Sequence, residues 1–413
     1  MKATTTLDSS ESPSAPVGRK KNLGILFLVT LLDLIGFGMI LPLIPYLGRA
    51  TESSPVMVGL LMSIYSIMQF LFSPFWGGFS DRLGRKPILL VSIFGAAISH
   101  TAFAFAQGYW ALFLTRLFAG LFSANISTAM ASAADLSSEK NRTQTMGLIG
   151  AAFGLGFVLG PFLGAQGASI GPYFGFNDQF ASLLAGGLSG LNFLFCLFFF
   201  SESLKQKAEK VSINLKRLNP FSSFYGLSSN LKASVGLFFA ASFGLALIEV
   251  VLFFVVQDQY DWNYKDASYG FAGVGLVMAF TQGGLIRPLK KRFSELTLIY
   301  AGGLIFTLGL FCAYAFNELY LFGFSILFLS LGYAIINPSL NGYISLQARS
   351  DQQGSSFGVT HGFSALSRIL GPILGTYLLG AAGLKTPFLA ASAVIGFSLF
   401  AFVIYFKYKK SQS

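Results

Sequence analysis

The strongest constraint in this sequence is a succession of apolar runs, each long enough to cross a lipid bilayer, with short polar turns between them. A crossing needs about 20 apolar residues, and at that length the runs divide into twelve segments. These lie at 23–47, 56–79, 87–107, 109–133, 143–166, 181–201, 233–256, 267–288, 296–316, 318–343, 355–381 and 386–406. The chain is 54% hydrophobic and 11% charged, whereas soluble proteins carry about 25% charged residues. We therefore predict an all-α polytopic membrane protein with no room for a soluble domain.

The positive charges lie on one side of this predicted topology. If the N-terminus is cytoplasmic, the outside turns hold only Arg49, Lys265 and Lys385, and Arg116 and Arg368 fall within helices. Every other Lys and Arg falls in a tail or turn on the cytoplasmic side. The positive-inside rule then predicts that both termini are cytoplasmic. The net charge of +11 therefore indicates membrane topology, not nucleic-acid binding, and the compact chain suggests a bacterial inner (plasma) membrane.

The chain divides near its middle, at the longest polar stretch between predicted helices. We expect a disordered cytoplasmic tail at 1–22, a six-helix bundle at 23–201, a cytoplasmic linker at 202–232, a second bundle at 233–407 and a tail at 408–413. The linker has the composition of a segment that can include an interfacial helix. Two internal similarities support two related halves. The spacing of Gly147, Gly160-Pro161 and Gly164 recurs as Gly358, Gly371-Pro372 and Gly375, and residues 283–292 echo residues 77–86. Such repeats predict two pseudo-symmetric bundles that face each other across a central path.

The charged turn GGFSDRLGRK at 77–86 lies between two predicted helices. Its glycines would let two helix ends approach closely, and its acid can make charge-assisted hydrogen bonds. We interpret the turn as a gating latch on the cytoplasmic side; the alternative is a positive loop that only sets orientation. The residues assigned to the latch are Gly77, Asp81, Arg82, Gly84, Arg85 and Lys86.

The fifth predicted helix carries small residues at helical neighbour spacing together with a proline. Small stripes allow close backbone packing in membranes, and a proline bends a helix. The segment is therefore either a packing surface with a coupled flexion point or a packing surface alone. Its key residues are Gly147, Gly156, Gly160, Pro161 and Gly164.

Four ionisable residues fall clearly within predicted helices: Asp33, Arg116, Glu249 and Arg368. A charge at the bilayer centre costs on the order of 3 kcal/mol, so such residues mark functional paths. Two acids and two bases would balance around one cavity. We predict that Asp33 or Glu249 carries a coupling proton, with Arg116 as its electrostatic partner; the alternative is a set of static salt bridges.

Other polar residues within the helices give weaker signals. Candidates for hydrogen bonds to a substrate are Asn125, Gln257, Gln282, Asn337, His100 and His361, although polar residues also join helices and a packed histidine is common. No metal-ligand spacing, nucleophile with a base or phosphate-binding loop is present in the sequence. We expect no enzyme activity, no metal, no cofactor and no ATP drive.

Several of these segments resemble the major facilitator superfamily. GGFSDRLGRK is similar to the signature turn between its helices 2 and 3, and the topology and central loop also fit. LDLIGFGMILPLIP at 32–45 and LTRLFAGLFSA at 114–124 resemble the helix 1 and helix 4 motifs of the 12-helix drug:proton antiporter branch. GLIGAAFGLGFVLGPFLGA at 147–165 resembles the antiporter motif of helix 5, with Ala165 in place of its last glycine.

The resemblance implies the major facilitator fold, alternating access and a turn at 77–86 that closes the cytoplasmic side. Helix 1 is most similar to the tetracycline efflux group, which has acids in helices 3 and 9 and a histidine in helix 8. This sequence has only Ser99 and His100 near the helix 3 position and lacks the other two groups, so tetracycline is not the expected substrate.

These observations together predict a secondary active transporter. We expect proton-coupled efflux of a small hydrophobic or cationic compound, driven by the proton gradient. The alternatives are a uniporter or symporter for a metabolite or organic anion, and a membrane scaffold or sensor that does not transport. The expected partners are a small-molecule substrate, protons and the lipid bilayer, with no nucleic acid, and the expected state is a monomer.

Overall fold

The structure, a computed structural model, describes residues 17–123, 125–137, 142–204, 207, 224–348 and 353–412. Its N-terminal half contains α1 (Val17–Ile40), α2 (Leu43–Ala50), α3 (Pro55–Leu83), α4 (Arg85–Ala104), α5 (Tyr109–Leu121), α6 (Asn125–Asp135), α7 (Arg142–Ile170), the 3-10 turn η2 (Gly171–Phe174) and α8 (Phe180–Phe199). The C-terminal half contains α10 (Ser229–Tyr260), α11 (Tyr264–Phe280), the π-helical turn η4 (Thr281–Leu285), α12 (Ile286–Arg292), α13 (Glu295–Ala315), α14 (Leu319–Gln347), α15 (Gln353–Ala382) and α16 (Thr386–Gln412).

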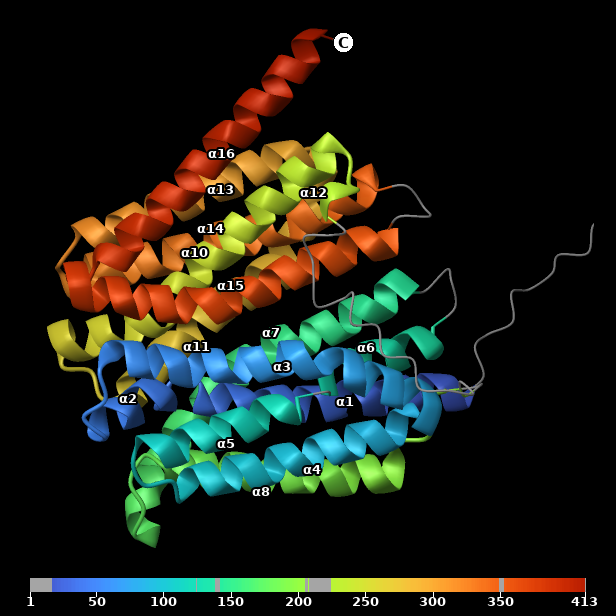
Figure 1. Cartoon of the computed structure of the whole chain (residues 1–413), viewed down its shortest axis with the longest axis vertical. Coiled ribbons are helices and arrows are strands. Elements are labelled where there is room, and N and C mark those ends of the chain that lie inside the picture. Colours follow the sequence, from blue (N-terminus) through green and yellow to red (C-terminus); the bar gives the residue numbers. More distant parts are fainter. Residues whose placement is uncertain are drawn as a thin grey trace, which may run out of the picture.

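The two halves repeat one packing scheme. In the first half α1 packs on α7 and α8, and α4 packs on α8; in the second half α10 packs on α15 and α16, and α13 packs on α16. Figure 1 shows the halves as two stacked groups of helices. The halves meet where α3 packs on α15 and α7 packs on α11. The predicted arrangement of two pseudo-symmetric helical bundles is confirmed.

The described helices match the membrane-spanning runs of the sequence. Eleven of them are long and apolar enough to cross a membrane, and a further crossing is divided between α5 and α6. Large apolar side chains such as Phe198, Phe397 and Tyr320 are exposed on the outer surfaces, as expected for helices that face lipid. The protein is an integral, multi-pass membrane protein.

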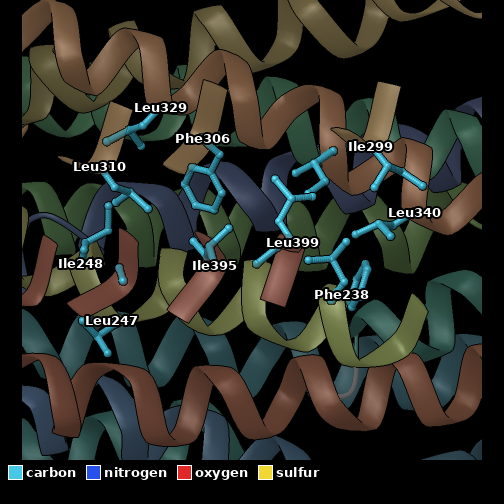
Figure 2. Packing of buried hydrophobic residues seen from close by; sticks show 14 of the residues in the cluster. Phe238, Leu247, Ile248, Ile299, Phe306, Leu310, Leu329, Leu340, Ile395 and Leu399 are labelled. Carbon is cyan, nitrogen blue, oxygen red and sulfur yellow. The ribbon is translucent and has the colours of Figure 1, made fainter. Parts of the chain in front are cut away.

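The core of the C-terminal half is apolar and closely packed. Figure 2 shows side chains from α10, α13, α14 and α16, among them Phe238, Phe306, Leu340 and Leu399, coming together between the helices. Backbones also touch in this core. A Cβ on Gly332 would lie 2.3 Å from the backbone nitrogen of Phe306, so α14 and α13 can pack at this distance only with glycine.

The predicted helix boundaries differ from the structure at the chain ends. Helix α1 begins at Val17 and α16 continues to Gln412, so part of each predicted tail is helical. At both ends, the residues that flank the apolar run continue its helix beyond the bilayer. Residues 1–16 of the predicted disordered tail, and the 208–223 part of the linker where an interfacial helix was considered, lie outside the described residues.

Three crossings contain breaks that the apolar pattern did not predict. The first separates α1 from α2 at Leu41–Pro42, where the proline cannot donate a backbone hydrogen bond. The second separates α5 from α6. There the carbonyl of Leu121 accepts a hydrogen bond from Trp76 Nε1 at 2.7 Å, and the carbonyl of Phe122 accepts one from the Ser92 hydroxyl. These bonds satisfy backbone groups that cannot reach water. The third is η4, which widens the eighth crossing at Gly283 and Gly284.

The two ends of the helical bundles carry different turns. The end called the linker end carries the turn between α3 and α4, the end of α8 and the start of α10. The far end carries the α2–α3, α4–α5, α7–α8, α10–α11, α13–α14 and α15–α16 turns. Figure 1 shows α6 and α12 on one side and the α2 and α11 turns on the opposite side.

Candidate functional site

The two halves are joined by polar contacts on the far-end side. Arg49 forms a bidentate ion pair with Asp258 of the other half, with Nη2 2.6 Å from Oδ2. The Arg49 guanidinium also lies 4.4 Å from the centre of the Phe254 ring. Tyr46 donates to the carbonyl of Trp262 and Tyr264 donates to the carbonyl of Met39, each at 2.9 Å. An apolar cluster that contains residues of both halves surrounds these contacts.

The surfaces of α7 and α11 separate toward the linker end. A Cβ on Gly164 would lie 2.5 Å from the hydroxyl of Tyr264, and one on Gly275 would lie 2.8 Å from the carbonyl of Phe157. Nearer the linker end, a Cβ on Gly154 would be 3.9 Å from Ala279, and one turn further Gly150 has no atom within 4 Å.

The surfaces of α3 and α15 behave in the same way. Gly59 fits tightly against Pro372 and Thr376, and the Ser63 hydroxyl donates to the carbonyl of Ile369 at 2.7 Å. Gly77 of α3 and Gly358 of α15, both nearer the linker end, have no atom within 4 Å of an added Cβ. The described parts of the halves are therefore closed at the far end and part toward the linker end.

Arg116 lies at the centre of the N-terminal half. Its side chain comes from α5 and is only 2% exposed. The guanidinium carbon of Arg116 lies 4.6 Å from the centre of the Tyr65 ring and 5.9 Å from the centre of the Phe37 ring. Its Nε–H has no acceptor among the described residues, and it forms no ion pair with a described carboxylate. Two aromatic faces stabilise the cation in place of a counter-ion. Asp33 of α1 is 7% exposed. Its charge and the charge of Arg116 both act on the Tyr65 hydroxyl.

Glu249 and Arg368 form the corresponding centre of the C-terminal half. The Arg368 charge acts on the Glu249 carboxyl group, and both charges act on the Tyr333 hydroxyl. Arg368 is exposed and its Nη1 donates to the Ser364 hydroxyl at 3.2 Å. Glu249 is half-buried and makes no hydrogen bond or ion pair with another residue that the structure describes.

Tyr65 connects the two centres. It lies on α3, which packs against α15 of the other half, and the charge of Arg368 acts on its hydroxyl together with those of Arg116 and Asp33. Arg116 thus stacks on a residue of α3, Arg368 lies on α15, against which α3 packs, and Glu249 lies on α10, which also packs on α15.

The weaker polar candidates do not all join this centre. Asn337 does, because its amide donates to the Tyr333 hydroxyl at 3.0 Å. His361 also lies near it, because the Arg368 charge acts on its ring. His100 does not face an open space: it is 5% exposed and its Nδ1 is 3.3 Å from the Ser189 hydroxyl of α8, so it is a packed core histidine.

The other three candidates have different surroundings. Gln257 lies near the far end, and its buried Oε1 has no partner among the described residues. Gln282 is exposed within the π-helical turn η4. The side chain of Asn125 lies outside the described residues.

Two carboxylates from other helices bind the turn at 77–86: Glu202, at the end of α8, and Asp135, at the end of α6. Glu202, just after α8, accepts from the backbone nitrogens of Arg85 at 2.9 Å and Lys86 at 3.1 Å, and so caps α4. The Arg85 side chain bridges Asp81 at 2.6 Å and Asp135 at 2.9 Å. Gly84 has a φ of 118°, and a Cβ there would lie 2.3 Å from the Glu202 carboxylate, so the turn requires glycine.

The other members of the predicted latch contribute less to this cluster. The Lys86 ammonium donates to the carbonyl of Leu197 at 2.8 Å. Arg82 is exposed. Gly77 lies within α3 and faces open space, so it does not bring two helix ends together as expected. The contacts described for Asp81, Arg85 and Lys86 all stay within the N-terminal half.

The glycines of α7 pack against α1. A Cβ on Gly156 would lie 2.6 Å from the Cβ of Leu34, and one on Gly160 would lie 2.7 Å from the Cα of Gly38. Gly164 approaches α1 as well, at 3.1 Å from the carbonyl of Met39. Pro161 lies beside this seam, within α7. The surroundings of Gly147 lie outside what the structure describes.

Comparison with known proteins identifies the family of the chain. The family model described as Major Facilitator Superfamily matches residues 26–372 and 288–413. This chain belongs to the major facilitator superfamily. The resemblance inferred from the motifs is therefore confirmed, and the protein is a transporter of this superfamily, not an enzyme.

Relatives of this transporter cover most of its length. The class D tetracycline resistance protein of Salmonella ordonez is 30% identical over 359 residues, which are 86% of this chain and 88% of that protein. Major facilitator superfamily domain-containing protein 10 of Mus musculus is 27% identical over 443 residues, covering 95% of this chain and 94% of that protein. The crystal structure of the human organic anion transporter MFSD10 superposes with a TM-score of 0.71 at 26% identity, covering 94% and 100% of the two chains.

Three functional candidates of this transporter were missed in the sequence. Glu202 and Asp135 each follow an apolar run as its first acid, and that position is the only sequence signal that could have paired them with the turn at 77–86. Tyr65 gave no signal, because the chain contains 16 tyrosines and 46 phenylalanines. Only the packing of α3 on α5 and α15 distinguishes it.

Proposed function

We propose that this transporter is a secondary exporter that exchanges a small organic compound for protons by alternating access. Glu249 carries the proposal. It is a half-buried carboxyl group in the membrane-spanning helix α10, which packs on α15, the helix of Arg368, and it makes no hydrogen bond or ion pair among the described residues. A permanently charged carboxylate in this position would be costly. A carboxyl group that binds and releases a proton as the site changes its access avoids that cost.

Asp33 supports Glu249 in this proposal. It is more deeply buried than Glu249 and lies close to the Arg116 and Tyr65 pair. Protonation of Glu249 would leave the positive charge of Arg368 less compensated. The two halves are linked electrostatically through Tyr65, so a change of charge on one side can alter the balance on the other. We assign the coupling proton to Glu249 and a balancing role to Asp33.

The orientation of the transporter is part of the proposal. We place the linker end in the cytoplasm because the basic residues gather there. The described conformation, closed at the far end, then opens toward the cytoplasm, where an exporter takes up its substrate. The cluster around Asp81 and Arg85 is the corresponding latch, which would meet the other half when the linker end closes.

We propose a hydrophobic or cationic compound as the substrate. Relatives of this chain are tetracycline resistance proteins, and the carboxyl group of Glu249 can attract a cation. A second candidate is transport of an organic anion. It is favoured by the exposed guanidinium of Arg368 and by Arg116, which has no described carboxylate partner. A resolved relative, the human protein MFSD10, is described as an organic anion transporter.

Flux into liposomes tests these proposals. Purified protein is reconstituted and the movement of ethidium, tetracycline and fluorescein is followed with and without an imposed pH gradient. We expect one cationic or hydrophobic probe to accumulate only with the gradient. We also expect Glu249→Gln to lose this accumulation while exchange of labelled for unlabelled probe continues, because exchange needs no net proton movement.

The same assay separates the alternatives. Accumulation of fluorescein alone would support the organic-anion transporter. Equal flux with and without the gradient would support a uniporter and overturn proton coupling. Absence of flux for every probe, in protein that is folded by its melting curve, would favour a scaffold or sensor.

A further inference from the structure

An apolar cavity lies outside the central site, near the far end of the C-terminal half. It has a volume of about 270 Å³ and lies between α10, α11 and α14. Its walls include Phe253, Val256, Val274, Phe322 and Ile326. A dry cavity of about 150 Å³ is already large enough to bind benzene, so this space can hold a considerably longer hydrocarbon.

Two glycines on facing helices keep the cavity open. Gly273 of α11 and Gly323 of α14 both line it, and a Cβ on either would have no atom within 4 Å. Leu327, another wall residue, is 42% exposed, and its neighbour Phe324 is 66% exposed. The cavity therefore opens on the outer surface of the bundle, where the membrane-spanning helices face lipid.

A cation lies beside one wall of the cavity. The Lys385 ammonium lies 4.8 Å from the centre of the Phe322 ring, which forms part of the cavity wall. It donates to the side-chain oxygen of Asn317 at 3.0 Å and to the carbonyl of Phe316. An ammonium group has three donors, so one N–H remains for a ligand. Glu318 follows these acceptors directly in the sequence and is exposed.

We propose that this cavity binds one acyl chain of a zwitterionic phospholipid, with the lipid phosphate beside Lys385. Its walls are apolar, so a charged substrate would find no partner inside. Its position between membrane-spanning helices, with an ammonium group against its Phe322 wall near the far-end turns, matches a hydrocarbon chain below a phosphate. The carboxylate of Glu318 opposes a lipid with net negative charge. The site is separate from the transport centre, and the proposal does not depend on which substrate is carried.

Trp262 provides a direct reporter because its side chain lines the cavity. The protein is reconstituted in phosphatidylcholine whose acyl chains carry bromine, which quenches nearby tryptophan fluorescence. The Trp262 contribution is taken as the emission that a Trp262→Phe variant lacks. We expect strong quenching of this contribution, and at least a twofold weaker effect in Gly323→Leu and Gly273→Leu, whose side chains occupy the cavity.

A matched control uses a glycine that faces open space elsewhere. Gly187 of α8 also has no atom within 4 Å of an added Cβ, so Gly187→Leu should leave the quenching of Trp262 unchanged. Lys385→Ala should reduce the quenching partly, because the phosphate contact is lost.

Lipid retained by detergent-purified protein supplies a second measurement. Mass spectrometry should find about one phospholipid fewer per chain in Gly323→Leu than in the parent and in Gly187→Leu. Equal quenching and equal retained lipid in parent and Gly323→Leu would overturn the proposal. Lost quenching with unchanged retained lipid would also overturn it, because the retained phospholipid would then lie outside this cavity.

Discussion

Arg116 illustrates how single residues are stabilised in this transporter. Its guanidinium is almost fully buried, yet it contacts two aromatic rings and no described carboxylate. A planar, weakly hydrated guanidinium can stack on aromatic faces in this way, whereas an ammonium group is compact and strongly hydrated. The position therefore depends on shape as well as charge.

Replacing Arg116 with lysine should test this dependence. The charge is kept, but the stacking on Tyr65 is lost, and we expect transport to fall at least tenfold while the protein still folds. Flux in liposomes and the melting temperature in detergent provide the two readings. The matched control is Arg292→Lys, which changes an exposed residue outside the predicted latch and should transport normally. Full transport by Arg116→Lys would mean that only the charge matters.

We expect Gly160→Ala to destabilise the protein, because the close packing around Gly160 leaves no room for a side chain. A Cβ would lie 2.7 Å from the Cα of Gly38, so Gly160→Ala must separate α7 from α1 at a cost of about 1–3 kcal/mol. The melting temperature should fall. Gly150→Ala, on the same helix but facing open space, should melt close to the parent. Similar melting of the two variants would show that the close approach of α7 and α1 contributes little to stability.

At the scale of elements, the turn between α3 and α4 shows how a short motif is completed by distant residues. Its glycine sets the backbone, and Glu202 and Asp135, from the ends of α8 and α6, supply the carboxylates. The turn thereby fixes the linker ends of four helices relative to one another.

Loss of the Glu202 carboxylate should loosen this end. Glu202→Ala removes the acceptor for four backbone N–H groups, two of them at the start of α4, and loss of the cap on α4 costs about 1 kcal/mol. We expect a lower melting temperature and faster amide hydrogen exchange at residues 85–88. Glu318→Ala, an exposed acid at the far end, serves as the comparison. Unchanged exchange at 85–88 in Glu202→Ala would show that the cap contributes little.

The elements and the centre were predictable from the sequence to different degrees. Apolar runs and one-sided positive charge specified the crossings, because a bilayer leaves few alternatives for the backbone. The breaks near Pro42, Phe122 and η4 were not predictable, since they depend on partners such as Trp76 and Ser92 in other helices. The central charges stood out because each is costly in an apolar run, whereas Tyr65 acquires its position only from helix packing.

At the scale of the whole molecule, contacts at the far end hold the described conformation. The Arg49–Asp258 pair joins the halves and is partly exposed, at 29% and 36%. A partly exposed pair contributes about 1 kcal/mol or less, which corresponds to a population shift of up to about fivefold. The pair can therefore bias the closure of the far end without making it irreversible.

Arg49→Asp should shift the population toward opening at the far end. We expect a cysteine introduced at Leu47, which packs partly buried against the apolar cluster at this end, to react several-fold faster with a water-soluble maleimide in this background. The combined Arg49→Asp and Asp258→Arg exchange should restore the slower rate, because it restores opposite charges across the halves. Failure of the exchange to restore it would show that the pair does not hold the gate.

Alternating access requires the two halves to rock about the charged centre, so that one end closes as the other opens. Two distances measured by electron spin resonance test this motion. One label pair lies at the linker end, at Leu83 and Phe293, and the other lies at the far end, at Trp110 and Tyr320, all exposed positions. Cys196 and Cys312 are replaced by serine.

Rocking of the halves predicts opposite changes in these two distances. When a change of pH drives the transition, the linker-end distance should shorten while the far-end distance lengthens. Glu249→Gln should abolish this response to pH. Distances that stay constant under all conditions, or that change together in the same direction, would contradict alternating access in this protein.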